Sequence, residues 1–367
     1  MVDINAVCNE LLALANVVGV GIGYKTTNGE VVLDDDGNPI ECVVVSVRAK
    51  VPASELGAQD MVPATVDGTR PDVVATGPIT IVSESSVEAA ATIDPKLRRR
   101  PIVPGLSIGL NPGVTAGTLG FIVERAGSSN RYILSNWHVM ASNNTPVENR
   151  DIVTITQPGN ADGGRAPADV IANLVEFVPI NSGDGGTPIP IPDLPSDCRV
   201  ASAVVWLPNL LAQITRSDTR LAPIINSTVG RALAEGDNLV DAALALVDAP
   251  YDRTTPEIGI VTGTGTPTLG MQVQKFGRTT SHTVGTITQV SATFNVQGYP
   301  GGTTTFSDQV AITADSGSFL EGGDSGSGLV SMDGKAVGLC FAGSPSIGIA
   351  NTWPNVEAAL NVKPASS

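Results

Sequence analysis

Two short segments far apart in the chain restrict its fold more than any other feature. Leu-Ser-Asn-Trp-His-Val at residues 134–139 contains His138, and Gly-Asp-Ser-Gly-Ser-Gly at residues 323–328 contains Ser325. A serine becomes a nucleophile when a base takes its proton and an acid orients that base. Asp241 lies between the segments, so the order His, Asp, Ser predicts a catalytic triad assembled from three distant parts of the chain.

The chain order of these residues excludes one rival fold. An α/β-hydrolase requires the nucleophile first, then the acid, then the histidine, and its serine stands in Gly-x-Ser-x-Gly. No histidine follows Ser325, and Ser327 occupies the last position of that pattern. A Ser-Lys dyad with Lys335 stays open, but it leaves His138 without a role.

The choice of acid rests on the local pattern. Asp241 opens the apolar run Asp-Ala-Ala-Leu, whereas Asp237 lies in the turn-like Glu-Gly-Asp-Asn and Asp248 precedes Ala-Pro. Each residue also has a plain structural interpretation: a lone histidine is often a core residue, and Gly-Asp-Ser-Gly can be a turn in a chain with 40 glycines. The pairing of the two motifs favours the triad His138, Asp241 and Ser325.

The rest of the chain has the pattern of a mainly β protein. Short valine-, isoleucine- and threonine-rich runs are separated by glycine and proline, which together number 66 residues, 40 Gly and 26 Pro. Such runs predict strands joined by turns. Helical spacing of apolar residues is confined mainly to residues 4–16 and 354–361, with a further interrupted pattern in residues 200–214.

The pattern predicts four regions. Residues 1–90 are expected to form a small α/β accessory domain and residues 91–104 a polar, basic linker. Residues 105–250 are expected to form a first β-barrel with an insertion near 180–236, which either covers the site, joins subunits or is a passive excursion. Residues 251–367 are expected to form a second β-barrel and a C-terminal helix.

The three motif segments resemble those of chymotrypsin/trypsin-fold serine peptidases, over roughly residues 101–362. The chain looks most similar to cytosolic bacterial trypsin-like proteins that also resemble the plant narrow-leaf protease. Three further segments carry this resemblance: Thr115–Gly120, Gln157–Gly164 and Gly277–Thr280. It implies a chymotrypsin-like double β-barrel and peptide-bond hydrolysis through an acyl-enzyme.

The resemblance also implies roles for residues around the nucleophile. The backbone N–H groups of Gly323 and Ser325 would form the oxyanion hole. Phe341 and Gly343 would lie on the strand that pairs with substrate, and Phe319 would stand at the base of the specificity pocket. Phe341 takes the place of a serine that supports the acid in the family, so another group must satisfy the Asp241 carboxylate.

Two other expectations follow from the same comparison. Relatives activated by cleavage pair a new N-terminus with the aspartate before the nucleophile, here Asp324. Pro101 follows Arg100 and would block a trypsin-type cut, so we expect Asp324 to have a different partner. His282 either lines the specificity pocket, as a histidine does in some relatives, or lies on a strand surface.

Composition restricts the partners. The formal charge is −15, and the single basic run at residues 96–100 does not predict nucleic-acid binding. No metal-binding cysteine spacing occurs, and no metal or other cofactor is predicted. The absence of a basic leader, of a long apolar segment and of a secretory cysteine pattern predicts a cytoplasmic protein without membrane attachment.

The sequence therefore predicts a serine endopeptidase that acts on a protein or peptide substrate. Two alternatives stay open: a non-catalytic binding or assembly protein that retains the fold, and an esterase or acyltransferase that uses the same triad. Homo-oligomerisation also stays open.

Overall fold

The computed structural model describes residues 4–57, 60–66, 68–81, 93–113, 115–141, 153–181 and 238–366. All of these belong to one compact unit. The insertion expected near 180–236, the rival acid Asp237 and the interrupted helical pattern at 200–214 lie almost wholly outside the described residues. Among the described residues, no helix is long and apolar enough to span a bilayer.

An antiparallel sheet built from the first half of the barrel region forms the first barrel. Its order is β23-β9-β10-β13-β12-β11-β7-β8. β8 leads through only Leu119 and Gly120 into β9, so the sheet returns to its starting point and closes, which leaves few free edges. The strands are β7 (Ser107–Asn111), β8 (Gly117–Thr118), β9 (Phe121–Glu124), β10 (Tyr132–Ser135), β11 (Thr154–Thr156), β12 (Val170–Phe177), β13 (Ala243–Val247) and β23 (Lys363–Pro364).

The second barrel is a closed ring of hydrogen-bonded strands, in the order β17-β20-β21-β22-β19-β18 and back to β17. Its strands are β17 (Gln272–Gly277), β18 (Ser281–Tyr299), β19 (Gly302–Ala314), β20 (Gly328–Ser331), β21 (Lys335–Gly343) and β22 (Gly348–Thr352). Three short strands lie before it, and β16 pairs with β21: β14 (Thr254–Thr255), β15 (Gly259–Ile260) and β16 (Gly263–Thr264). The mainly β, chymotrypsin-like double-barrel fold is confirmed.

The hairpin of β18 and β19 is much longer than the sequence predicted. The local sequence pattern predicts strands only over residues 283–290 and 308–313 of it. The outer half contains Gly298 and a run of threonines that breaks the alternation of apolar and polar residues. It remains a strand because β1 (Val17–Tyr24) pairs along it, with Gly19 opposite Phe294.

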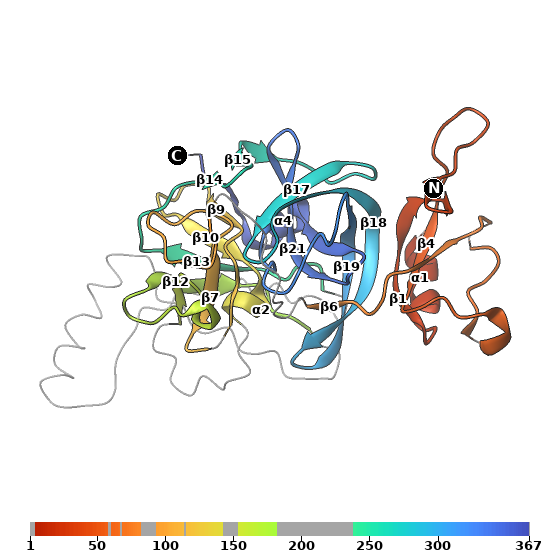
Figure 1. Cartoon of the computed structure of the whole chain (residues 1–367), viewed down its shortest axis with the longest axis horizontal. Coiled ribbons are helices and arrows are strands. Elements are labelled where there is room, and N and C mark those ends of the chain that lie inside the picture. Colours follow the sequence, from red (N-terminus) through yellow and green to blue (C-terminus); the bar gives the residue numbers. More distant parts are fainter. Residues whose placement is uncertain are drawn as a thin grey trace, which may run out of the picture. The chain divides into compact units, whose positions relative to one another are not determined.

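The N-terminal region adds an α/β element to this second sheet. Helix α1 (Ile4–Leu12) buries Ile4, Cys8 and Leu11, at helical spacing, against β1. Strand β1 pairs with both β18 and β4 (Glu41–Val47), and β5 (Asp72–Ala75) lies beyond β4. The region has its own apolar cluster, but its strands continue the hydrogen-bonded order of the barrel sheet rather than forming a separate one. Figure 1 shows α1, β1 and β4 together in the N-terminal part of the chain.

Four smaller elements and one turn complete this region. The run Asp34–Asn38 is typical of a turn and forms one: the Asp34 amide donates to Asn38 O at 2.8 Å and the Gly37 amide to Asp34 O at 3.0 Å. The elements are β2 (Thr26–Thr27), β3 (Glu30–Val31), a 3-10 turn η1 (Ala53–Glu55) and β6 (Thr80–Ile81). A second 3-10 turn, η3 (Asn160–Asp162), lies in the first barrel.

The stretch predicted as a linker is attached to the first barrel where it is described. Arg98 forms an ion pair with Asp169 at 2.8 Å, and Ile102 is fully buried. The Ile102 amide donates to Pro250 O at 2.8 Å. These contacts fix the path of residues 93–104 along the barrel.

The predicted C-terminal helix is present as α4 (Trp353–Leu360). It buries Trp353, Val356 and Leu360 against a cluster that includes residues from both barrels. Asn361 ends it in the left-handed conformation, with φ of 52°, which asparagine tolerates. The chain then returns to the first barrel as β23 beside β9.

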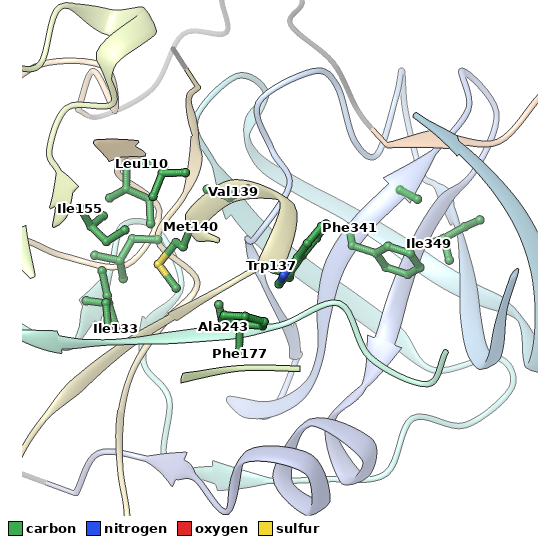
Figure 2. Packing of buried hydrophobic residues seen from close by; sticks show 14 of the residues in the cluster. Leu110, Ile133, Trp137, Val139, Met140, Ile155, Phe177, Ala243, Phe341 and Ile349 are labelled. Atoms are coloured by element: carbon green, nitrogen blue, oxygen red, sulfur yellow. The ribbon is translucent and has the colours of Figure 1, made fainter. Parts of the chain in front are cut away.

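The largest apolar cluster contains side chains from both barrels. It includes Ile133 and Ala243 from the first barrel and Phe341 and Ile349 from the second (Figure 2). Trp137 belongs to the same cluster, so the residue next to His138 is anchored where both barrels contribute packing.

Candidate active site

His138 lies on a short helix that the first barrel holds rigidly. Helix α2 (Trp137–Met140) follows β10 directly and buries Trp137, Val139 and Met140, whose side chains are shown in Figure 2. Asn136, just before it, is extended and donates from Nδ2 to Asp241 O at 2.8 Å. The backbone of His138 is therefore held in place by its buried neighbours, while 10% of its side chain remains exposed to solvent.

Asp241 meets His138 because β10 and β13 pair in register. Ser135 lies opposite Ala243, which brings the residues flanking the two strands together. His138 Nδ1 lies 2.5 Å from Asp241 Oδ2, and the His138 amide donates to Oδ1 at 3.3 Å. A carboxylate accepts from Nδ1–H, so this contact leaves Nε2 as the proton acceptor of the imidazole.

The Asp241 carboxylate has a further partner that sequence reasoning missed. The hydroxyl of Tyr299, at the end of β18, donates to Asp241 Oδ2. Burial, and then the adjacent Asp241 charge, raise the pKa of Tyr299 well above its ordinary value, so the hydroxyl remains a neutral donor. Because Phe341 takes the place of the serine that would support this carboxylate, another donor was expected, and Tyr299 supplies one.

Aromatic rings extend this contact across the barrels. The Tyr299 ring lies 6.1 Å from the His138 ring and 5.2 Å from the Phe306 ring, centroid to centroid. Phe306 in turn lies 4.8 Å from Phe341. This chain of rings runs from the base to the strand that contacts the nucleophile.

Ser325 lies in the loop before β20, docked on the first barrel. Its carbonyl accepts from the Thr118 amide at 2.8 Å, and the Thr118 hydroxyl donates to Gly323 O at 2.8 Å. A Cβ on Gly117 would come within 2.5 Å of Val139 and 3.0 Å of Ser325 O. Gly117 thus lies between the nucleophile and the residue after His138, and it must be small for the two to approach.

The Ser325 hydroxyl donates to Phe341 O at 3.2 Å. The buried His138 Nε2 has no hydrogen-bond partner among the described residues. The acceptor nitrogen and the nucleophile thus come from opposite barrels, and Gly117 lies close to both Val139, the residue after His138, and the Ser325 carbonyl.

The loop before Ser325 contains the residues expected to form an oxyanion hole, and its backbone conformation is specific. Gly323 has φ of 99°, in the left-handed region that favours glycine. Asp324 and Ser327 amides donate within the turn, to Glu321 O and Asp324 O. The amides of Gly323 and Ser325, by contrast, donate to no protein acceptor within the described ranges.

Asp324 is held by a lysine. The Lys275 ammonium lies 3.3 Å from Asp324 Oδ2, and both side chains are fully buried. The carboxylate also accepts from the amides of Thr279, Thr280 and Glu321 and from the Thr280 hydroxyl. The expected alternative partner for Asp324 is therefore Lys275, within β17.

The other segments of the sequence resemblance bind the barrels together. Arg278 forms a two-pronged contact with Asp162, with both N···O distances at 2.6 Å. Asp162 also accepts from the Ser107 hydroxyl at 2.5 Å. This buried, bidentate guanidinium–carboxylate pair fixes the position of η3 relative to the loop after β17.

The residues predicted to bind substrate lie in three settings. Phe319 is 2% exposed, and a Cβ on Gly285 or Gly348 would come within 3.1 or 2.8 Å of its ring. Phe341 is buried and presents its carbonyl to Ser325. Gly343 pairs with Thr80 of β6.

The structure also places Lys335, the rival base, and His282, the candidate residue of the specificity pocket. Lys335 forms an ion pair with Asp333 at 2.7 Å and is half-exposed. It begins β21, six residues before Phe341, which is about 20 Å of strand. His282 contacts Gln274 at 2.9 Å and Glu257 at 3.7 Å, on the face of β18 next to β17.

Comparison with known proteins finds no matching protein-family model and no matching curated protein. Solved structures similar to the chain include Thermobifida fusca Protease A (14% identity, TM-score 0.41), Nocardiopsis protease (17%, 0.39) and Cellulomonas bogoriensis chymotrypsin (14%, 0.38). Each similarity covers 72% of this chain and 99% of the solved chain. Among the described residues, no cluster of His, Cys, Asp and Glu is placed to hold a metal ion.

Proposed function

We propose that the chain is a serine endopeptidase that hydrolyses peptide bonds through an acyl-enzyme on Ser325. The observation that carries the proposal is the His138–Asp241 pair, with Nδ1 and Oδ2 2.5 Å apart and the buried acceptor nitrogen Nε2 without a partner among the described residues. A structural histidine would be expected to satisfy both ring nitrogens in a buried site.

In the proposed reaction, Ser325 Oγ exchanges the Phe341 carbonyl for His138 Nε2. The imidazole takes the hydroxyl proton as Oγ bonds to the substrate carbonyl carbon, and Asp241 stabilises the imidazolium. Nε2 then gives that proton to the leaving amine as the C–N bond breaks. Water deprotonated by the same nitrogen cleaves the ester and restores Ser325.

Backbone amides would stabilise the negative charge that develops in the reaction. The free amides of Gly323 and Ser325 would donate to the oxyanion of the tetrahedral intermediate. One such donor contributes about 3 kcal/mol to transition-state stabilisation. The Lys275–Asp324 pair would hold these amides in place without proteolytic activation, because its ammonium is already part of the chain.

Labelling with a fluorophosphonate probe tests the nucleophile without knowledge of the substrate. Wild-type protein should be labelled, and both Ser325→Ala and His138→Ala should lose labelling because the triad acts as a unit. Ser331→Ala, a buried serine away from the site, and Lys335→Met should retain it. Labelling of Ser325→Ala, or its loss in Lys335→Met alone, would contradict the triad.

A peptide library then separates peptidase from esterase activity. Cleavage of internal peptide bonds by wild type and not by Ser325→Ala supports the proposal. Ester hydrolysis with no peptide cleavage even at high enzyme concentration and long incubation would favour the esterase, and an unlabelled wild type would favour a non-catalytic binding protein. We also propose, from Phe319 at the expected pocket base, that apolar or small residues are preferred before the cut.

A further inference from the structure

The short strand β6 is not part of the closed ring of the second barrel, but it pairs with two of the ring's strands, β21 and β18. Its antiparallel partners on β21 are Ala342 for Ile81 and Gly343 for Thr80. On its other side Thr80 pairs in parallel with Gln297 of β18, whose amide donates to Ile79 O at 2.9 Å. Figure 1 shows β6 within the barrel region although it comes from the N-terminal part of the chain.

The edge that β6 occupies is the one where the nucleophile stands. β20 pairs with β21 only as far as Leu339, and the Cys340 backbone bonds to Ser327 and Gly326. The next carbonyl on that side, Phe341 O, accepts from Ser325 Oγ. Pairing then continues with Ile81 at Ala342. On β21, the residue paired with Ile81 of β6 therefore directly follows Phe341, whose carbonyl contacts Ser325.

Side chains anchor β6 in this position. Ile79 is 1% exposed and belongs to the cluster that holds Tyr299, Phe306 and Phe341. A Cβ on Gly298 would come within 2.5 Å of Ile81, so the backbone of β18 passes directly against that side chain. The Ser346 hydroxyl donates to Thr76 O at 2.9 Å, just before the strand.

An extended peptide that is to be cut needs this same edge. Adding a strand to a sheet edge positions a peptide by main-chain hydrogen bonds and seats alternate side chains in pockets. On β21, such a strand would bring its next peptide bonds toward Ser325. Ala342 and Gly343 cannot pair with a substrate and with β6 at the same time.

We infer that residues 79–81 are an autoinhibitory strand, which occupies the substrate-binding edge of β21 and must leave before extended peptides are cleaved. This inference rests on the proposed peptidase function. It also names the substrate class, because the occupant that fits the groove is an extended segment with apolar β-branched side chains where Ile79 and Ile81 stand. The blocked feature is the strand edge; the nucleophile itself is not covered by this pairing.

Ile79→Asp tests the inference by placing a charge in the buried anchor position. The variant should cleave peptides long enough to pair with Ala342 and Gly343 at least tenfold faster than wild type, measured as kcat/KM. Hydrolysis of p-nitrophenyl acetate, which is too short to use the edge, should change less than twofold. Met61→Asp, an exposed position in the same N-terminal region, is the matched control and should behave as wild type.

A reversible cross-link covers the case in which Ile79→Asp fails to fold. The double variant Ile81→Cys with Ala342→Cys replaces a directly opposed pair. Its oxidised form should lose cleavage of long peptides but retain ester hydrolysis, and reductant should restore cleavage in the same sample. Undiminished peptide cleavage in the oxidised, cross-linked protein would overturn the autoinhibitory role.

The two proposals fail in different ways. If fluorophosphonate labels wild type but Ile79→Asp is folded and no faster on long peptides, β6 is only a structural strap and the peptidase proposal stands. If neither wild type nor the variant is labelled or hydrolyses the ester, the proposed function fails, and the autoinhibitory role is overturned with it.

Discussion

Tyr299→Phe is the substitution that most directly tests how the base is oriented. It removes one hydroxyl and keeps a ring that contacts Trp137, His138 and Phe306. The hydroxyl donates to Asp241 Oδ2, and the Asp241 side chain is fully buried. Water cannot replace the lost donor easily at such a site, so the effect should exceed that of a surface hydrogen bond.

The magnitude follows from the type of bond. A hydrogen bond to a charged group contributes about 1.5–3 kcal/mol. Asp241 keeps His138 Nδ1 at 2.5 Å and the His138 amide at 3.3 Å, so the lower end applies. Because about 1.36 kcal/mol corresponds to a factor of ten in rate, kcat should fall roughly tenfold with little change in KM.

The pH profile separates orientation of the base from simple structural damage. Without the Tyr299 hydroxyl, the carboxylate attracts a proton on His138 more strongly. The rising limb of the profile of kcat/KM against pH should therefore move to higher pH in Tyr299→Phe. Tyr132→Phe, a buried tyrosine of the first barrel, is the control and should leave both the limb and kcat in place. A Tyr299→Phe enzyme with wild-type kcat and profile would refute the role assigned to this hydroxyl.

Two further outcomes are expected from the buried groups of the second barrel. Lys275→Met leaves Asp324 buried without its countercharge, so urea unfolding should show a loss of about 3–5 kcal/mol; an unchanged midpoint would contradict the ion pair. Burial raises the pKa of the Cys340 thiol to about 12, so it should resist iodoacetamide at pH 9 in the native protein and react once the protein is unfolded in urea. Rapid native alkylation at Cys340 would show that this part of the barrel opens.

Much of the secondary structure follows from local pattern. β1 and β10 are short, mainly apolar runs of the kind that predicts strands, and the apolar pattern of each run coincides with the strand that the structure shows. The helices α1 and α4 follow from apolar residues at helical spacing. The outer half of β18 was missed because its strand conformation depends on pairing with β1, more than 250 residues earlier in the chain.

The candidate triad was also accessible from sequence, since His138 and Ser325 stand in distinctive motifs and Asp241 opens an apolar strand. Their partners were not. From sequence it was clear that the Asp241 carboxylate needed another donor and that Asp324 needed a different partner. Sequence alone does not identify Tyr299 or Lys275, because neither lies in a recognisable motif near the residue it serves.

The sequence by itself determined which residues have the chemistry and which runs form strands, because side-chain identity and apolar periodicity are local properties. The tertiary structure alone decided that Tyr299 reaches Asp241, that Lys275 is buried against Asp324 and that β6 lies on the edge beside Ser325. These contacts depend on strand register and barrel closure. Register and closure are set by burial of the whole molecule, which no single segment of the chain encodes.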